Sequence, residues 1–394
     1  MKRTVKILSL LAAFLLLAGC AHQPAVTVPA TTAPQTAPPT TVPATTVVPQ
    51  TRPVVTAPTT PDPTVTEPAA ESFVLSFAGD CTFGDNFGSE EETGTFCKVV
   101  KDKYGYPLSN VRDYFLNDDL TLVNLECALT ASDPTEEEME TLKENLFRFR
   151  GPVEYTNILL EGGVEFASCA NNHSRDYGQQ GLKDTWAALE EAEIAYASFG
   201  KSTVVETQRG LKVGIFTVFF NTTESSVKMV VDSLKSRGAQ LIIMSVHWGD
   251  EGTYTPTEQQ YSIGHMAIDA GVHIVYGHHS HTLQPIESYH GGIIYYSTGN
   301  FSFGGNRNPK DKDTAILQQQ ILLYEDGTVA LGGLTVIPCR VSTSDTWNDY
   351  RPTPYEPGSE EYLRCIAKLE GSFEGPAVDV PYLTQPPETT VHTP

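Results

Sequence analysis

The sequence predicts an α/β domain with a mostly parallel central sheet, preceded by a leader and a spacer. Two observations lead to this prediction. Short apolar runs rich in β-branched residues alternate with stretches whose apolar residues recur at helical spacing. Polar and titratable residues directly follow several of these apolar runs, and this is where ligands bind in open α/β sheets.

The N-terminus has the pattern of a secretion signal. A basic start at residues 2–6 precedes the apolar run 7–17, which is too short to span a bilayer comfortably. The run ends in Leu17-Ala18-Gly19-Cys20, which resembles the lipobox of bacterial lipoproteins. We therefore expect residues 1–19 to be removed and lipid on Cys20 to hold the protein at the extracellular face of the cell membrane. The alternative is an ordinary signal peptide with an accidental cysteine.

The next segment, 20–70, has the composition of an extended spacer. It contains 12 Pro and 14 Thr but only three charged residues. Such a sequence cannot supply a core, so we expect a disordered, partly polyproline stalk. The folded domain is then expected over 71–345, followed by a C-terminal extension over 346–394 with one helix and a Pro/Thr-rich tail.

Within the folded part, seven apolar runs have the length and composition of buried strands. They are 73–78, 120–125, 164–168, 211–219, 241–246, 272–276 and 293–296. Three stretches place apolar residues on one helical face. They are 181–193, 225–237 and 257–270, the last beginning with Thr257 as a candidate N-cap.

The charge balance excludes one class of partner. The 394 residues include 48 acidic and 26 basic side chains, for a net charge of -22. Nucleic-acid-binding proteins gain affinity by neutralising phosphates with Lys and Arg, so we expect no nucleic-acid partner. The hydrophobic fraction of 40% is enough for a substantial core.

Polar side chains follow six of the strand-like runs, and together they have the chemistry of a metal site. Because such strand ends meet at one sheet edge, we expect carboxylate, amide and imidazole groups to converge there. This set suits one or two divalent ions such as Mn, Fe, Zn or Mg. The motifs are Gly79-Asp80, Asn124-Leu125-Glu126, Asn171-Asn172-His173, His247-Trp248-Gly249, Gly277-His278-His279-Ser280-His281 and Gly299-Asn300-Phe301.

Some of these residues also have an ordinary structural explanation. Asp80 alone is typical of a turn or helix cap, and His247 alone of a core histidine. Glu126 is harder to explain structurally, because an unpaired carboxylate at a buried strand end is costly. His279 and His281 lie two positions apart, so both can approach one ion, and we expect this pair to bind metal.

The ordered motifs resemble those of the CapA family, the poly-γ-glutamate capsule biosynthesis proteins, from about residue 73 to 340. The resemblance is carried by the strand-end motifs above together with Ala170-Asn171-Asn172-His173-Ser174-Arg175-Asp176-Tyr177-Gly178 and Tyr296-Ser297-Thr298-Gly299-Asn300-Phe301. It implies a fold related to calcineurin-like metallophosphoesterases, a four-layer α/β sandwich of two mixed β-sheets flanked by helices.

The resemblance also implies roles for individual residues. Metal ligands are expected at Asp80, Glu126, Asn172, His247, His279 and His281, with Glu126 placed between two ions. His173 is expected to protonate a leaving oxygen, and Asp176 to orient it. Substrate contacts, or support for the ligands, are expected from Asn171, Asn300, Glu251 and His278. Thr82 stands where metallophosphoesterases usually carry a second ligand, so the number of ions, one or two, stays open.

The cysteines leave several possibilities open. Six remain after Cys20, so an exported protein could form up to three disulfides. Cys81 with Cys97 and Cys339 with Cys365 are the pairs nearest in sequence. Cys127 and Cys169 adjoin the site motifs, but a thiolate role in metal binding is the less favoured interpretation for them.

Two classes of function fit these observations. The first is a metal-dependent hydrolase or transferase of the cell surface, acting on a phosphoester or on an anionic polymer. The second is a non-catalytic accessory protein that binds or guides an anionic surface polymer within a capsule synthesis or export machinery. Because the chain is strongly acidic, either function requires the polymer to be held at cations in a cleft rather than by diffuse attraction.

Overall fold

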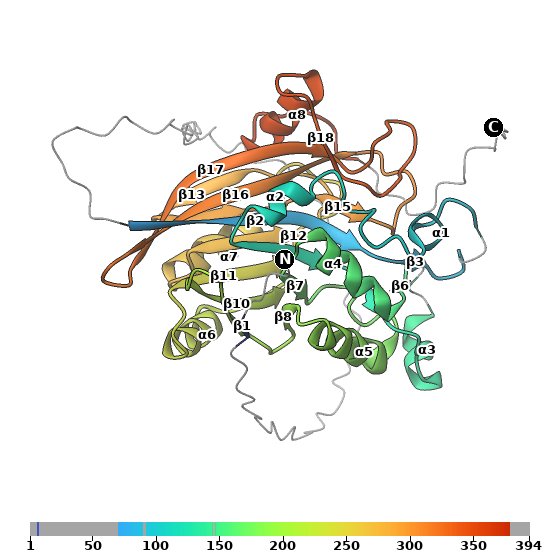
Figure 1. The fold of residues 1–394 in the computed structure, drawn as a ribbon, viewed down its shortest axis with the longest axis horizontal. Coiled ribbons are helices and arrows are strands. Elements are labelled where there is room, and N and C mark those ends of the chain that lie inside the picture. Colours follow the sequence, from blue (N-terminus) through green and yellow to red (C-terminus); the bar gives the residue numbers. More distant parts are fainter. Residues whose placement is uncertain (1–5, 8–69, 90–91, 144, 146, 379–394) are drawn as a thin grey trace, which may run out of the picture. The chain divides into compact units, whose positions relative to one another are not determined.

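Two large mixed sheets form the centre of the protein in the computed structural model, which describes residues 6–7, 70–89, 92–143, 145 and 147–378 (Figure 1). The first sheet has the order β1 (Lys6–Ile7), β9 (Thr203–Glu206), β10 (Lys212–Phe219), β11 (Leu241–His247), β12 (Ile274–His278), β14 (Gly292–Tyr295) and β13 (Ile286–Tyr289). Strands β10, β11, β12 and β14 run parallel, and the strands outside them are antiparallel.

The second sheet has parallel strands on one side and antiparallel strands on the other. Its order is β18 (Thr353–Pro354), β17 (Val329–Arg340), β16 (Asp313–Tyr324), β2 (Ala70–Thr82), β4 (Leu120–Leu125), β7 (Phe166–Cys169) and β8 (Ala195–Ser198), and β15 (Asn300–Phe303) pairs with the end of β2. A small third sheet joins β3 (Asp85–Asn86), β6 (Phe149–Gly151) and β5 (Ala128–Leu129).

Alternation of buried residues along the strands explains why the two sheets stack. In β11, Leu241 and Ile243 face the other sheet, whereas Ile242 and Met244 face helices on the outside. Strand β4 does the same, with Leu122 in the core between the sheets. Because side chains alternate along a strand, each central strand buries both of its faces. The predicted four-layer sandwich is therefore confirmed.

Helices cover the outer faces of both sheets. The first sheet packs against α6 (Glu224–Ser236) and α7 (Glu258–Asp269), and the core on the far side of the second sheet includes residues of α2 (Arg112–Leu116), α4 (Thr156–Gly162) and α5 (Gly178–Glu191). The shorter α1 (Phe96–Val100), α3 (Glu136–Leu142) and the 3₁₀ helix Val153–Tyr155 lie near the third sheet, and α8 (Glu360–Leu369) packs on β16 and β17 (Figure 1). None of the helices within the described ranges is both long and apolar enough to cross a membrane.

The predicted elements are largely confirmed, but one expectation about their arrangement is wrong. All seven predicted strands and all three predicted helices are present, and Thr257 caps α7 with a reciprocal bond to Gln260. The expected single, mostly parallel central sheet is absent from the described part of the chain, because the parallel strands are divided between two sheets. The long antiparallel pair of β16 and β17 was not predicted from the sequence; it completes the second sheet beside β2.

The C-terminal extension is part of the folded structure as far as residue 378. The buried ammonium of Lys368 in α8 lies 2.7 Å from Asp313 of β16 and 2.8 Å from Asp311. Arg364 makes two further bonds to Asp313, at 2.6 and 2.7 Å. These ion pairs attach α8 to the hairpin of β16 and β17.

The described cysteines are all free thiols. The suggested pairs Cys81–Cys97 and Cys339–Cys365 are therefore wrong for this structure. Cys339 lies in the core outside the second sheet and Cys365 in the core between the sheets, so a sheet separates them.

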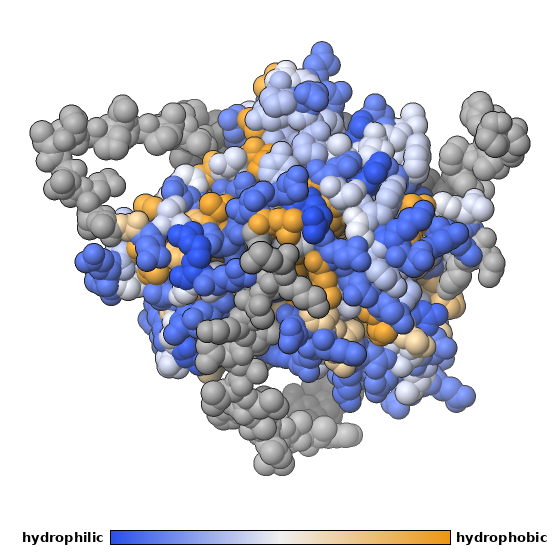
Figure 2. Space-filling model, in the orientation of Figure 1, coloured by the Kyte–Doolittle hydropathy of each residue, from blue (hydrophilic) through white to orange (hydrophobic). Residues whose placement is uncertain are grey.

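The leader, Cys20 and the stalk lie outside the described residues, apart from 6–7 and 70. On the face in view, hydrophobic side chains reach the surface of the described part only in small groups (Figure 2). This agrees with a domain in which most apolar residues are buried in three internal clusters.

Candidate metal centre

The carboxyl ends of the parallel strands of both sheets meet at one edge of the sandwich. Asp80 lies near the end of strand β2 of the second sheet, two residues before Thr82, and Glu126 follows β4. Strand β11 of the first sheet ends with His247, and His279 follows β12. The second sheet therefore supplies carboxylates and the first sheet supplies imidazoles, which explains how motifs far apart in sequence form one site.

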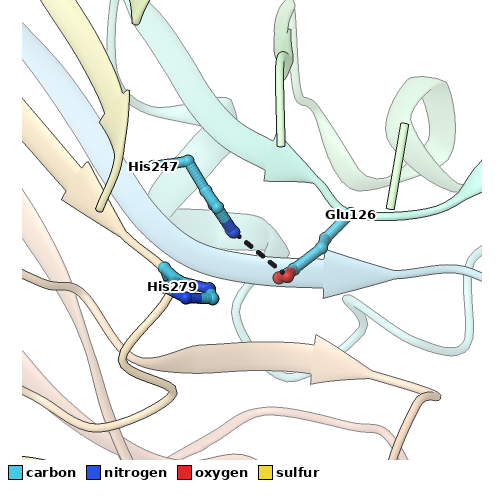
Figure 3. A group of neighbouring side chains, drawn as sticks. All are labelled: Glu126, His247 and His279. Carbon is cyan, nitrogen blue, oxygen red and sulfur yellow. Dashed lines mark ion pairs between the residues drawn. The ribbon is translucent and has the colours of Figure 1, made fainter. Parts of the chain in front are cut away.

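Three overlapping groups of side chains have the spacing of metal ligands. Their ligand atoms lie within 4.8 Å of one another in each group: Glu126 with His247 and His279, Asp80 with Glu126 and His281, and Glu251 with His279 and His281. Glu126 belongs to two of these groups. Figure 3 shows the Glu126 carboxylate, His247 and His279 pointing toward one another, and one Glu126 oxygen lies 3.5 Å from His247 Nε2.

The hydrogen bonding of the carboxylates indicates that a cation belongs here. Asp80 and Glu126 are both fully buried, and among the described residues none donates a hydrogen bond to either Glu126 oxygen or to Asp80 Oδ2. Burial, followed by the charge of Asp80, raises the pKa of Glu126 well above its usual range. Two buried carboxylates this close repel unless a proton or a cation lies between them. These residues therefore fit a divalent ion.

The imidazoles are in the form that binds metal. Burial lowers the pKa of His279 to about 3 and holds the pKa of His247 well below its ordinary value. The Nδ1 atoms of both rings have no hydrogen-bond partner. Neutral rings with free nitrogen lone pairs are the form in which histidine coordinates a metal.

The loop after β12 adopts an uncommon backbone to present its histidines. His279 has φ of 97° and His281 has φ of 57°, in the left-handed region that non-glycine residues rarely occupy. His281 Nδ1 is hydrogen-bonded to Asn300 Oδ1 at 2.9 Å and lies 3.4 Å from Asp80 Oδ2. Such strain persists where the surrounding structure fixes it, and it is frequent at functional sites.

The close approach of β15 to β2 depends on Gly79. A Cβ atom at this position would lie 2.0 Å from the carbonyl oxygen of Gly299. The Asp80 amide donates to that oxygen at 2.8 Å. Glycine before Asp80 therefore allows the two strand ends to meet and fixes the backbone of the candidate ligand.

Amide side chains connect the candidate ligands. Asn172 Oδ1 lies 2.7 Å from His247 Nε2, so these two predicted ligands face the same point. Asn124 donates to Asp80 Oδ1 at 2.8 Å and accepts from Asn171 at 3.1 Å. Thr82, at the position where a further ligand is usual, instead donates its hydroxyl to the carbonyl of Glu126 at 3.0 Å.

His173 is held in one orientation by Asp176. Its Nδ1 lies 2.7 Å from Asp176 Oδ2, and the same oxygen accepts from the Phe149 amide at 2.7 Å. His173 also lies against the ring of Phe149, with centroids 4.2 Å apart. Because Nδ1 is engaged, Nε2 is the nitrogen of His173 that can exchange a proton with a ligand. The predicted pairing of His173 with Asp176 is thus present as geometry.

The structure changes the interpretation of four residues expected to contact substrate. Glu251 is exposed and lies among the candidate ligands, beside His279 and His281. Asn171 uses its amide nitrogen on Asn124 and on the carbonyl of Leu125, so it holds the loop.

His278 and Asn300 are buried instead of facing a ligand from the rim. His278 ends β12, its Nδ1 lies 3.4 Å from Asp80 Oδ1, and its ring packs on Tyr276. Asn300 orients His281 through the bond described above. Both side chains therefore lie beside candidate ligands, and their contact with substrate stays a prediction.

Two features of the site were missed from the sequence. Asn124 links Asp80 to Asn171, and the signal was a polar residue inside an otherwise apolar strand. Phe219 and Phe220 contact the candidate ligands from the end of β10. Nothing in their apolar character distinguished them from core residues. Cys127 and Cys169 are buried, burial raises the pKa of both thiols, and neither belongs to a candidate ligand group.

Fold and site together define an α/β sandwich with a buried carboxylate and histidine centre suited to divalent metal. The family model of the bacterial capsule synthesis protein PGA_cap matches residues 74–305, which include every candidate ligand. The chain belongs to this family.

Curated relatives agree with this assignment. The chain is 30% identical over 275 residues to the capsule biosynthesis protein CapA of Bacillus anthracis, covering 63% of this chain and 65% of that protein. It is 29% identical over 240 residues to the PGA biosynthesis protein CapA of Bacillus subtilis, covering 55% and 60%. A probable polyglutamine synthesis accessory protein of Mycobacterium tuberculosis is 28% identical over 219 residues, covering 46% and 54%. The matches thus span between 54% and 65% of each relative, less than two thirds of its length.

Solved structures are more distant. The NAD nucleotidase of Haemophilus influenzae superposes with a TM-score of 0.37 and 11% identity, over 77% of this chain and 56% of the enzyme. A purple acid phosphatase from yellow lupin superposes with a TM-score of 0.35 and 10% identity, over 76% of this chain and 56% of the phosphatase. At this level of likeness, neither enzyme's activity transfers to this chain.

Proposed function

We propose that this protein is a lipid-anchored, metal-dependent hydrolase of the outer cell surface that acts on a poly-γ-glutamate-like polymer, or on a phosphoester formed during its synthesis or export. The observation that carries the proposal is the position of Glu126. Its two oxygens are buried without a donor at the junction of two candidate ligand groups. A carboxylate in this position is costly unless one or two cations share it.

The ligands proposed to hold metal are Asp80, Glu126, Asn172, His247, His279 and His281, with Glu251 as an exposed addition. A divalent ion bound there would supply Lewis-acid polarisation of the bond to be cleaved and activation of water. Mixed oxygen and nitrogen ligands suit Mn, Fe or Zn, and Mg to a lesser extent.

Residues of the chain itself supply proton transfer. His173 is proposed to donate a proton from Nε2 to the leaving oxygen, because Asp176 occupies Nδ1 and holds the ring still. Burial raises the pKa of Asp176, and the contact with His173 offsets part of this shift. The arrangement resembles other imidazoles that a buried carboxylate fixes in one tautomer.

A second candidate function is a non-catalytic accessory role in which the metal only grips carboxylates of the polymer. The printed name of the Mycobacterium tuberculosis relative, a probable synthesis accessory protein, favours this candidate. The same ligands would be used, but His173 and Asp176 would have no proton to transfer.

Elemental analysis of the purified full-length protein tests the proposal, followed by a screen of phosphoester and γ-glutamyl substrates with each candidate metal. Bound metal with turnover supports the hydrolase. Bound metal with polymer binding but no turnover supports the accessory role. Failure to bind any of the four metals would contradict both.

A further inference from the structure

An aromatic row extends from the metal centre to the surface of the protein. We define it as Phe199, Phe219 and Phe220. Phe219 ends β10 in register with His247, and the amide of Phe220 donates to the His247 carbonyl at 2.9 Å. Phe199 directly follows β8. All three residues therefore lie at the same sheet edge as the candidate ligands.

Ring contacts join the row to the ligands without interruption. Centroid distances are 5.9 Å for Phe199 to Phe219 and 4.7 Å for Phe219 to Phe220. The ring of Phe220 lies 5.2 Å from that of His279, and Phe219 lies 6.2 Å from His247.

The aromatic row combines exposed apolar side chains with a strained backbone, and both features are unfavourable for stability. Phe219 and Phe220 are 37% and 36% exposed, although most of the large aromatic side chains nearby are buried. Phe220 also has φ of 57°, which is strained for a bulky residue. Exposed apolar surface and strain beside a metal centre indicate a surface that binds a ligand.

Arg175 stands at the outer end of the row. Its guanidinium carbon lies 4.8 Å from the centre of the Phe199 ring, and the residue is exposed and only two positions after His173. Among the described residues, no carboxylate forms an ion pair with it. In a chain with 48 acidic side chains, an arginine without a carboxylate partner is free to receive an anion from a ligand.

Arg209 provides a contrast. Its guanidinium also stacks on a phenylalanine, at 4.5 Å from the Phe73 ring. It is, however, bonded to the carbonyl of Ser72 at 2.8 Å and lies 3.4 Å from Asp119. The cation of Arg209 thus already has polar partners within the protein, whereas within the described part of the chain that of Arg175 contacts the Phe199 ring without an ion pair.

The geometry of the row selects the shape of the ligand. Phe199 and Phe219 meet at 86°, and Phe219 and Phe220 meet at 72°. Rings set edge to face provide no parallel pair between which a planar base could insert. They do provide an apolar surface along which flexible methylene groups can lie.

We propose that Arg175 and the aromatic row form a subsite for the outer repeat units of a polymer that carries carboxylates on aliphatic stems. The inference rests on the proposed function, because it requires one carboxylate of the bound polymer to lie at the metal centre. The stems of the next units cover the row, and Arg175 binds a later carboxylate. A γ-linked glutamate chain has this alternation of methylene groups and carboxylates, whereas a simple phosphomonoester carries no second anionic group to reach Arg175.

Binding of γ-linked glutamate oligomers of increasing length to the full-length, metal-loaded protein tests this subsite. The variants are Arg175→Met, which keeps an apolar stem, and Arg175→Lys, which keeps the stem and the charge but not the planar guanidinium. Arg209→Met is the matched control. Metal content is measured on every sample, so that failure of the subsite is distinguished from failure of the metal centre.

We expect Arg175→Met to weaken binding of long oligomers about tenfold, the usual effect of losing one charge-assisted hydrogen bond. Arg175→Lys should weaken it less, and the loss should shrink at high salt because the contact is exposed. Single glutamate should bind all variants equally, and Arg209→Met should match the wild type.

Equal oligomer affinity in Arg175→Met and wild type would overturn the subsite, as would metal-loaded wild type that binds no oligomer or binds a nucleotide in preference. If the wild-type protein is found to bind no metal, the proposed function is refuted instead. Binding that still depended on Arg175 and on oligomer length in that case would support the subsite alone.

Discussion

At the scale of single residues, Glu126, His279 and His281 matter most for the metal, because each belongs to two candidate ligand groups. We predict that Glu126→Ala and His279→Ala each lower the metal content, since a site with few protein ligands loses affinity with every ligand removed. Metal stoichiometry by elemental analysis is the measurement. His265→Ala is the control, because His265 pairs with Glu287 outside the candidate centre. Full metal occupancy in both site variants would refute the ligand set.

His173 should behave differently from the ligands. It belongs to none of the candidate groups, and its Nδ1 is bonded to Asp176. We predict that His173→Ala keeps its metal while turnover falls by about two to four orders of magnitude, the usual effect of losing a positioned proton donor. Metal content and rate are measured on the same sample. Loss of metal in this variant would show that His173 is a ligand, and unchanged turnover would exclude it as the acid.

At the scale of elements, the attachment of α8 depends on Asp313. Burial raises the pKa of this carboxyl, but the hydrogen bonds of Arg364 and the charge of Lys368 outweigh burial and hold the pKa below its ordinary value of 3.8. A depressed pKa in the folded state means that the charged form stabilises the fold. This stabilisation is present above pH 3.8 and is lost as the pH falls through the folded-state pKa.

We predict that Asp313→Asn lowers the free energy of unfolding at neutral pH by about 2–3 kcal/mol. This is below the usual cost of breaking a buried ion pair, because Lys368 keeps Asp311. Denaturant titrations across pH should show the difference from wild type narrowing on acidification. Asp133→Asn, which removes an exposed partner of Arg150, is the control and should change stability little. A difference that grew at low pH would contradict the assigned sign.

At the scale of the whole molecule, we propose that the stalk is not needed for the fold. Limited proteolysis of the full chain is predicted to release a stable core that begins near Ser72. Deleting residues 21–69 should leave the melting temperature of the core unchanged, because surface segments without tertiary contacts contribute little to stability. A loss of more than about 1 kcal/mol on deletion would place the domain boundary elsewhere.

Membrane attachment is predicted to depend on Cys20. Mass spectrometry of the mature N-terminus should find a lipidated cysteine at position 20, and Cys20→Ser should leave the leader uncleaved and the protein without lipid. An unmodified mature terminus at any other residue would rule out this form of attachment.

The sequence by itself determined the elements and the chemistry of the candidate site. Nearly continuous apolar runs located β4 and β11 because both faces of these strands are buried. Polar residues at strand ends identified Asp80, Glu126 and His247, because parallel strands bring such residues to one edge.

Only the tertiary structure decided how the parallel strands divide between two sheets and which polar residues face a ligand. Local periodicity reports burial but not which sheet a strand joins, so β16 and β17 beside β2 could not be predicted. The sequence left open whether Asn171 and Asn300 contact substrate or support the ligands, and only the structure shows that both bond to neighbours inside the protein. Phe219 and Phe220 look like core, yet they lie exposed beside the centre, because exposure depends on contacts between residues distant in sequence.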